Sequence, residues 1–345
     1  MDSMFKNGYI LSLAAMLLTG CSTNQPAAHQ EFPAAGSILR LDPALDALVP
    51  PDAKIEKLAG GFKFVEGPLS FSNGNVWFSD VVGNVVRQRS PNGTVTEILS
   101  PGGADNPGYA PAGSYIGPNG MVHGKDGVVL LCQHGNRRIA QIDKNRQVST
   151  FLDRWDGKRF NSPNDLVYKG DGALYFTDPP YGLVKQDDDP TKEIPFNGVF
   201  RYADGKLTPL VRDMTRPNGI AFSPDEKYLY ISNSDEKHRV WMRYDVQPDG
   251  SVANGKVFFD ATSEKAPGLP DGMKVDSKGN LYGAGPGGLW IFSPEGKHLG
   301  TIKPGEAPAN CNWGGSDRKT LYITAETGLY RVRLAVEGEK ALYND

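Results

Sequence analysis

Short stretches in which apolar and polar residues alternate recur along most of the chain, separated by tight-turn signals rich in Gly, Asp, Asn and Ser. A period of two residues indicates β-strands, and helical periodicity is nearly absent. Six stretches end in an apolar or aromatic run, at residues 76–78, 129–131, 174–176, 229–231, 281–283 and 321–323. The pattern predicts strand pairs joined by tight turns.

A polar anchor residue precedes each run by 10 or 11 positions. The six anchors are Glu66, Asn119, Asn164, Asn218, Asp271 and Asn310. Further strand-like segments complete the first two units at 85–89, 95–99, 139–142 and 148–152. Four strands in a unit that repeats every few tens of residues are typical of a propeller blade. We therefore predict an all-β fold, a six-bladed β-propeller with four-stranded blades, since a β-sandwich would not predict six equivalent anchors.

The last unit lacks a fourth strand, and a strand-like segment at residues 55–59 precedes the first anchor without a unit of its own. We expect this N-terminal strand to complete the last blade and close the ring, which removes open sheet edges. Two segments, 101–117 and 183–197, interrupt the repeats. They are interpreted as solvated loops that can overhang one mouth of the ring.

The N-terminus resembles the export signal of a bacterial lipoprotein. An apolar run at residues 9–18 is too short to span a bilayer, and Leu-Thr-Gly-Cys follows at 18–21. We expect a signal peptide at 1–20, lipidation of Cys21, a flexible tether at 21–38 and one catalytic propeller domain at 39–345. Ser22 after the cysteine favours the periplasmic face of the outer membrane. The alternative is an ordinary secretory signal with an incidental cysteine.

The composition of the chain limits the classes of molecule that we expect it to bind. The net charge is −3 over 345 residues, with 41 Gly and 26 Pro. No basic face suited to a phosphate backbone is apparent, so nucleic acid is excluded and membrane contact is expected only through the lipid anchor. Cys132 and Cys311 lie in repeats that should not be neighbours, so no disulfide between them is expected.

The anchors suggest a metal site, because the first strand of each propeller blade lines the central channel. All six anchors carry side-chain oxygen, and two are carboxylates. Such ligands suit a hard cation, and ligands from separate rigid blades suit Ca²⁺ better than Mg²⁺, although other divalent cations remain open. Zn²⁺ would favour His or Cys. The alternative is that the Asn-Gly and Asp-Gly pairs are only turn residues.

Six segments carry a resemblance to the senescence marker protein/gluconolactonase/luciferin-regenerating enzyme family, and most closely to its bacterial gluconolactonases. They are VEGP at 65–68, CQHGNRR at 132–138, NSPNDL at 161–166, FTDPPYG at 176–182, RPNGIAFSPD at 216–225 and LPDGM at 269–273. The resemblance implies a six-bladed propeller, a divalent cation and hydrolysis of a sugar lactone, such as gluconolactone, to the aldonic acid.

Carried over by position, the resemblance implies a metal-ligand set of Glu66, Asn164, Asn218 and Asp271. A cation there would polarise the lactone carbonyl, and Asp271 is the candidate base for the attacking water. Substrate-binding candidates are Asn119, His134, Arg137, Asp178 and Asn310. Two alternatives stay open: a phosphotriester hydrolase in which Asp271 is the nucleophile, and a calcium-stabilised lipoprotein that binds a sugar or a partner without catalysis.

Overall fold

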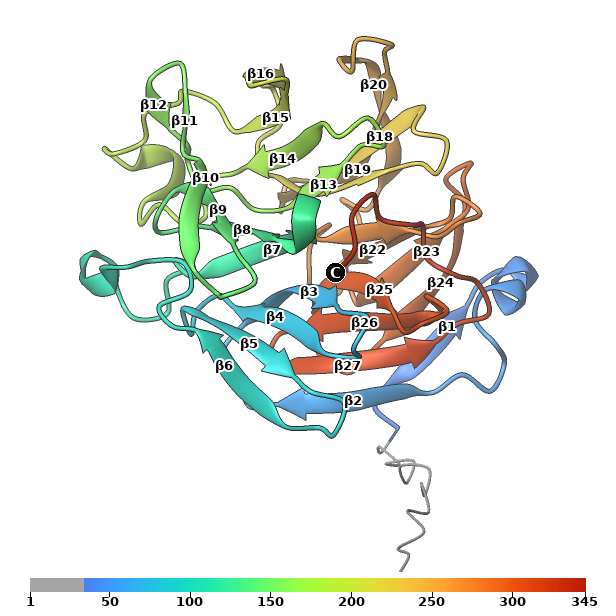
Figure 1. Ribbon diagram of the computed structural model, residues 1–345. Coiled ribbons are helices and arrows are strands. Elements are labelled where there is room, and N and C mark those ends of the chain that lie inside the picture. Colours follow the sequence, from blue (N-terminus) through green and yellow to red (C-terminus); the bar gives the residue numbers. More distant parts are fainter. Residues whose placement is uncertain (1–33) are drawn as a thin grey trace, which may run out of the picture. The chain divides into compact units, whose positions relative to one another are not determined.

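The computed structural model describes residues 34–345, which form six antiparallel sheets arranged around one axis (Figure 1). The first strands of successive sheets, β3, β7, β13, β17, β21 and β25, contact one another in a closed cycle. This is the predicted six-bladed β-propeller.

The first three blades follow one another along the chain. Blade one comprises β3 (Val65–Ser70), β4 (Val76–Asp80), β5 (Val85–Arg89) and β6 (Val95–Leu99). Blade two comprises β7 (Pro118–His123), β8 (Val129–Gln133), β9 (Arg138–Ile142) and β10 (Val148–Leu152). Blade three comprises β13 (Leu166–Tyr168), β14 (Leu174–Asp178), β15 (Gly198–Ala203) and β16 (Lys206–Val211).

The last three blades include both ends of the described chain. Blade four comprises β17 (Pro217–Phe222), β18 (Tyr228–Asp235), β19 (His238–Val246) and β20 (Val252–Asp260). Blade five comprises β21 (Met273–Val275), β22 (Leu281–Gly285), β23 (Gly288–Phe292), β24 (His298–Lys303) and the added strand β1 (Ser37–Arg40). Blade six comprises β25 (Pro308–Gly314), β26 (Thr320–Ala325), β27 (Gly328–Arg333) and β2 (Ile55–Gly60).

Smaller elements connect the blades. A hairpin of β11 (Arg154–Trp155) and β12 (Lys158–Arg159) joins blades two and three. The helical segments of the described chain are single 3₁₀ turns: η1 (Pro43–Ala47), η2 (Pro107–Tyr109), η3 (Lys125–Gly127) and η4 (Gln186–Asp188). None of the helices in residues 34–345 has the length and apolar character needed to cross a membrane.

The ring closes as predicted, because β2 pairs with β27 as the outer strand of blade six. Glu56 on β2 also forms an ion pair with Arg331 on β27. Regular structure begins earlier than residue 39, since Ala34 bridges to Glu56 and β1 pairs with β24. The residues after 33 in the expected tether are therefore part of the sheets. The expected signal peptide and Cys21 lie outside the described residues.

The core lies between the faces of adjacent blades. Tyr175 of blade three meets Phe222 of blade four edge to face, with ring centroids 4.9 Å apart. Tyr282 of blade five meets Trp313 of blade six in the same way at 5.0 Å. Each blade thus buries both faces against its neighbours, which accounts for the apolar-aromatic runs.

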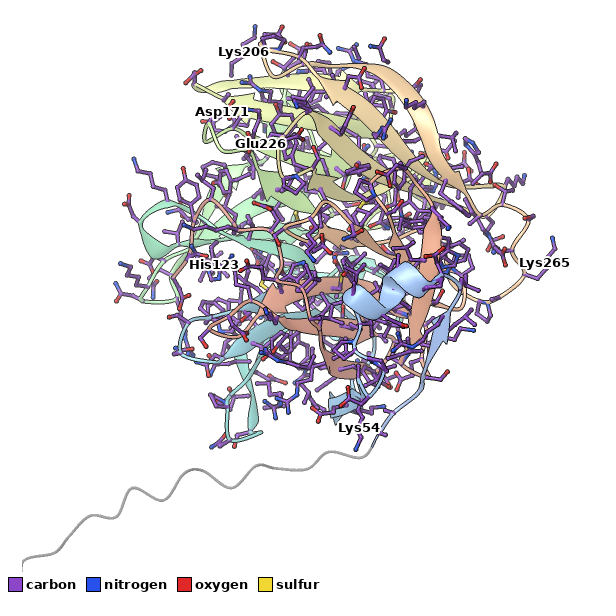
Figure 2. All side chains as sticks on the ribbon, turned by 90° about the vertical axis from the view of Figure 1, so that its right-hand side faces the viewer. Lys54, His123, Asp171, Lys206, Glu226 and Lys265 are labelled. Atoms are coloured by element: carbon purple, nitrogen blue, oxygen red, sulfur yellow. The ribbon has the colours of Figure 1, made fainter. Side chains whose placement is uncertain are left out.

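Polar contacts also join neighbouring blades at the turns. Lys169 lies 3.0 Å from Asp171 on its own turn and 3.2 Å from Glu226 of blade four. Asp171 and Glu226 are labelled in Figure 2. Cys132 and Cys311 are both buried and free in the described chain.

Candidate functional site

The anchor residues lie on or just before the innermost strands, where the strand pairing is interrupted. The register shifts between Glu66 and Leu69 in blade one, and between Pro118 and Met121 in blade two. Similar shifts follow Pro217 and Pro308. Bulges of this kind re-aim side chains and are common beside active sites.

The glycine that follows an anchor allows neighbouring blades to approach closely. A Cβ on Gly120 would lie 2.6 Å from the Asn164 carbonyl oxygen, and one on Gly219 would lie 2.4 Å from that of Asp271. Both glycines lie within strands, β7 and β17, and neither has a positive φ. The interpretation of these pairs as simple turn residues is therefore wrong at Asn119-Gly120 and Asn218-Gly219.

Hydroxyl groups of the second strands hold the anchor backbone of the next blade. Ser79 donates to the Asn119 carbonyl at 2.6 Å, and Thr177 donates to that of Asn218 at 2.6 Å. Ser232 donates to the Asp271 carbonyl at 2.9 Å. Each hydroxyl immediately follows an apolar run, so neighbouring blades fix one another's anchors at the axis.

Three buried or half-buried carboxyl groups near the axis influence one another's charge: Glu66, Asp165 and Asp271. Burial raises the pKa of Glu66 to about 7, and the charge of Asp165 adds to the effect. Burial also raises the pKa of Asp271 well above its usual range, and the charges of Glu66 and Asp165 raise it further. Carboxylates held together away from water repel one another, and a nearby cation would stabilise their ionised form.

Lys274 supplies one such positive charge, on the side of Asp165. Its ammonium group lies 3.6 Å from Asp165 Oδ2, and Asn310 Nδ2 donates to the same oxygen at 3.4 Å. The amide of Asn310 and the charge of Lys274 each oppose the rise in the pKa of Glu66. Asp165 is therefore paired, whereas Glu66 and Asp271 have no such ion-pair partner among residues 34–345.

Asn218 and Tyr181 lie beside Asp271. Asn218 Nδ2 donates to Ser234 Oγ at 2.9 Å, and Ser234 in turn donates to the Pro270 carbonyl. The Tyr181 hydroxyl is buried without a hydrogen-bond partner of good geometry. Burial first, and then the charge of Asp271, raise the pKa of Tyr181. Ser234 and Asn218 lie near this hydroxyl and lower its pKa in part, so a ligand at the axis could take a bond that the protein does not make with good geometry.

His134 orients the side chain of Asn119. His134 Nδ1 lies 2.9 Å from the Tyr115 carbonyl and Nε2 lies 3.2 Å from Asn119 Nδ2. Because the carbonyl only accepts, Nδ1 carries the proton and Nε2 accepts from the amide. Burial lowers the pKa of His134 to about 4, which keeps the ring neutral. Asn119 Oδ1 is left buried without a partner, so it is available to a cation or substrate.

Arg137 and Asp178 support loop backbone. Arg137 Nε donates to the Phe160 carbonyl at 2.6 Å and Nη1 donates to that of Thr191 at 2.9 Å. Asp178 accepts from the backbone N–H groups of Asn161 and Ser162 at 2.8 Å, which fixes the segment that carries Asn164. These contacts assign both residues a structural role, and their contact with substrate stays a prediction.

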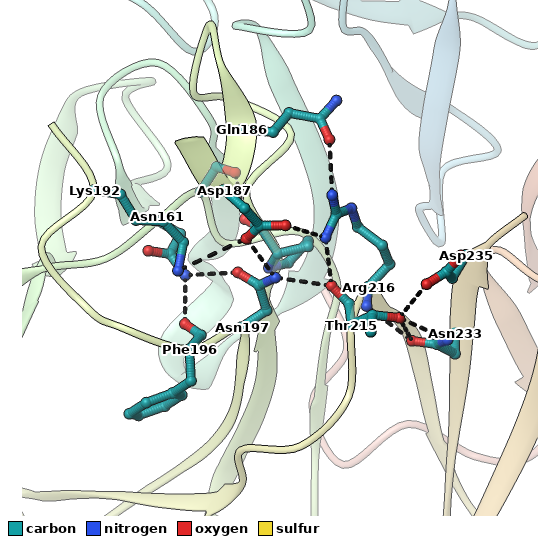
Figure 3. A network of polar contacts seen from close by, with 12 residues as sticks. Asn161, Gln186, Asp187, Lys192, Phe196, Asn197, Thr215, Arg216, Asn233 and Asp235 are labelled. Carbon is teal, nitrogen blue, oxygen red and sulfur yellow. Dashed lines mark hydrogen bonds and ion pairs between the residues drawn. The ribbon is translucent and has the colours of Figure 1, made fainter. Parts of the chain in front are cut away.

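A polar network holds the loop at residues 183–197 against blades three and four (Figure 3). Asn197 Nδ2 donates to Asp187 at 2.9 Å and to the Thr215 carbonyl at 2.8 Å. Asp187 is also ion-paired with Arg216. The loop is thus positioned by specific contacts.

A cavity of about 450 Å³ lies between this loop and the one at 101–117. Tyr109, Arg137, Arg159, Lys185 and Asp189 contribute to its lining. Gly135 and Gly182 also line it, directly after His134 and Tyr181 in the chain. The cavity therefore adjoins the axial residues along two segments.

The axial residues fit a hard cation better than they fit zinc. Among residues 34–345 no three His, Cys, Asp or Glu side chains gather as a metal-binding group. A cation here would need amide as well as carboxylate oxygens, and such mixed oxygen ligands suit Ca²⁺. The close approach of Glu66 and Asp271, together with the unpartnered oxygen of Asn119, supports such a site.

Several residues at the site were not singled out by the sequence pattern: Ser79, Asp165, Thr177, Tyr181, Ser232 and Lys274. A signal existed for the hydroxyls, since Ser or Thr follows the run in four of six blades. No comparable signal marks Tyr181, because it enters the site from the segment after blade three's second strand.

The structure is a closed six-bladed propeller with carboxyl and amide side chains near its axis. The model of the SMP-30/Gluconolactonase/LRE-like region matches residues 64–327, and the chain belongs to this family.

Relatives and solved structures agree with this. A gluconolactonase from Zymomonas mobilis is 39% identical to this chain, and the match covers 95% of this chain and 96% of that protein. The structure of a gluconolactonase from Xanthomonas campestris has a TM-score of 0.74 and 30% identity, covering 88% of this chain and 97% of that one. The calcium-binding protein regucalcin from Agrobacterium tumefaciens shares the fold, with a TM-score of 0.65, 20% identity, and coverage of 91% and 97%.

Proposed function

We propose that this protein is a lactone hydrolase that opens sugar lactones such as gluconolactone with the help of a divalent cation. The observation that carries the proposal is the convergence of Glu66 and Asp271 on the propeller axis, where each lacks an ion-pair partner in the described chain. Similarity to a gluconolactonase over nearly the whole chain supports the substrate class.

Glu66, Asn164, Asn218 and Asp271 would hold the cation. When bound, a divalent cation supplies Lewis acidity that polarises the lactone carbonyl. Ca²⁺ is the ion we favour, because oxygen ligands from separate rigid blades suit a large and flexible coordination shell. Asn119 and Asn310 complete the ring of amide groups around this set.

Asp271 is the proposed general base. Its carboxylate takes a proton from the water whose oxygen forms the new bond to the carbonyl carbon. The ring ester C–O bond then breaks, and the proton passes to the departing ring oxygen to leave a hydroxyl group. The Tyr181 hydroxyl is buried next to Asp271, Asn218 and Ser234, and we expect it to donate a hydrogen bond to substrate.

The test is a substrate panel with and without a chelator. Hydrolysis of D-glucono-1,5-lactone should be lost on chelation and restored by Ca²⁺ better than by Zn²⁺. Full lactonase activity in the chelated protein would refute the cation's role. Hydrolysis of a phosphotriester in place of lactones would favour the alternative in which Asp271 attacks phosphorus. Binding of a sugar without any turnover would favour the non-enzymatic alternative.

We also propose that the protein is anchored in the periplasm through Cys21. The proposal rests on the apolar run and the Leu-Thr-Gly-Cys sequence at residues 18–21. Cys21→Ala should move the protein from the membrane fraction to the soluble fraction. A wild-type protein that is already fully soluble after export would contradict the lipid anchor.

A further inference from the structure

The cavity between the loops at 101–117 and 183–197 is lined by more cations than anions. Arg137, Arg159 and Lys185 contribute three positive charges to its lining, and Asp189 contributes one negative charge. Glu193, outside the lining, forms an ion pair with Arg137 at 4.0 Å, and its other carboxylate oxygen accepts from the Arg159 backbone N–H at 2.7 Å. The cavity is therefore rich in hydrogen-bond donors and poor in free acceptors.

The two outer cations are the ones available to a ligand. Within residues 34–345 the guanidinium of Arg159 and the ammonium of Lys185 have neither a hydrogen-bond nor an ion-pair partner, although their backbone N–H groups are bonded. Arg137 is buried and donates to three backbone carbonyls, those of Phe160, Thr191 and Arg159. The charge of Arg159 also lowers the pKa of Arg137, after burial.

The single carboxylate in the lining is already occupied. Asp189 Oδ1 accepts from the Thr191 N–H at 2.9 Å and from the Thr191 hydroxyl at 2.6 Å. Asp189 Oδ2 accepts from the Lys185 N–H at 3.0 Å. These bonds shape the turn at 185–191. The charge of Asp189 acts on Arg137, but Asp189 forms no hydrogen bond or ion pair with the side chain of Arg159 or Lys185 in the described chain.

The cavity is also next to the axial residues. A Cβ on Gly182 would lie 2.7 Å from His134 Cβ, so the two wall segments touch one another. On one segment His134 bonds Asn119, and on the other Tyr181 lies beside Asp271. The cavity thus lies next to the segments that carry His134 and Tyr181, and we take a substrate at Asp271 to extend past Tyr181 toward the cations.

We propose that this cavity is an anion subsite, and that the preferred substrates are sugar lactones with an acidic group distal to the lactone, such as a phosphate or a carboxylate. The inference rests on the proposed lactonase function and names its substrate class. Arg159 and Lys185 are the specificity-determining residues, because a planar guanidinium and a mobile ammonium both pair with anionic oxygens. Tyr109, which is 54% exposed, forms the outer wall.

The experiment compares kcat/KM for D-glucono-1,5-lactone with that for its 6-phosphate and 6-carboxylate forms at low salt. Wild-type protein should favour the anionic lactones by about tenfold, the sum of two exposed ion pairs. Arg159→Met and Lys185→Met should each lower that preference by about two- to fivefold. The preference should also narrow at high salt, because exposed charges are screened.

Arg154→Met is the matched control. Arg154 pairs with Arg159 across the β11–β12 hairpin and does not line the cavity. Its substitution by Met removes the same charge as Arg159→Met. The ratio of the two kcat/KM values should be unchanged in this variant. Thermal melting of all three variants verifies that they fold.

The outcomes separate the two proposals. If wild-type protein opens the neutral lactone but shows no preference for anionic ones, or if all three variants shift the ratio equally, the subsite is refuted while the lactonase function stands. If no lactone of any kind is opened, the proposed function itself fails. The phosphate and carboxylate forms identify which acidic group the cavity takes.

Discussion

Asp271 combines two tasks at the axis, since it is both a ligand candidate and the candidate base. Its neighbours explain why these tasks can be separated by substitution. The charge of Glu66 raises the pKa of Asp271, while the amide of Asn218 opposes that rise. Removing the charge of Asp271 therefore differs from removing a neutral amide ligand.

We expect Asp271→Asn to retain part of the cation affinity, because an oxygen ligand and the Glu66 carboxylate remain. Turnover at saturating Ca²⁺ should fall by about 10²–10⁴, the usual contribution of a general base. Asn218→Ala should lose activity that excess Ca²⁺ partly recovers. Steady-state kinetics of both variants at saturating Ca²⁺ test the role of Asp271 as base. If Asp271→Asn recovers wild-type turnover, Asp271 is only a ligand. Asp178 is then the next candidate base.

The buried His134 should make the free energy of unfolding depend on pH in the acidic range. Burial lowers its pKa to about 4, from the usual 6.5 of a histidine. Between these values the unfolded chain binds a proton that the folded chain does not, so the stability contribution is lost as pH falls from about 6.5 toward 4. The loss should reach about 2–3 kcal/mol.

The measurement is the free energy of unfolding of wild-type protein and His134→Gln across this pH range. Subtracting one pH profile from the other separates the contribution of His134 from those of Glu66 and Asp178. Burial raises the pKa values of those two carboxyl groups to about 7, so their effects on stability have the opposite sign. Parallel pH profiles for the two proteins would show that His134 does not remain neutral in the folded state.

The anchors could be predicted at the residue scale because they repeat at a fixed offset from a buried strand. Tyr181 and Lys274 could not, since neither occupies a repeated position. Asp165 was within reach as the neighbour of Asn164, but its pairing with Lys274 depends on how blades three and five meet at the axis.

At the scale of elements, the second strand of one blade positions the anchor of the next. Ser232 on β18 accepts from the Gly219 N–H at 2.8 Å and donates to the Asp271 carbonyl at 2.9 Å. It thus joins β17 to the segment before β21. The alternating pattern predicted these strands, but not β1 or the β11–β12 hairpin, which are too short or too polar to stand out.

Ser232→Ala should therefore affect both stability and turnover. It leaves the Gly219 N–H and the Asp271 carbonyl without this partner, which should cost about 1–3 kcal/mol. Turnover should fall because Asp271 is no longer held by blade four. Chemical denaturation and steady-state kinetics measure the two effects. Ser223→Ala, in the turn that follows β17, is a control: it should leave kcat unchanged, and equal loss in both variants would argue against positioning.

At the scale of the whole molecule, a cation at the axis would join blades one, three, four and five through their anchors. An ion that binds only the folded chain stabilises it by about 2.7 kcal/mol at one hundred times its Kd. We expect chelation to lower Tm by several degrees and added Ca²⁺ to restore it. Scanning calorimetry at several Ca²⁺ concentrations tests this, and a Tm independent of Ca²⁺ would argue against an axial ion.

The pairing of β2 with β27 has a consequence for the order in which the molecule assembles. β2 ends at residue 60 and β27 begins at residue 328. At about 5–20 residues per second, synthesis of the chain between them takes on the order of 15–50 s, and a chain exported N-terminus first likewise has β2 available before β27. During that interval β2 has no partner strand in its own chain, and the β27 segment of another chain can pair with it. A high local concentration of incompletely folded chains would therefore favour strand-exchanged dimers over monomers.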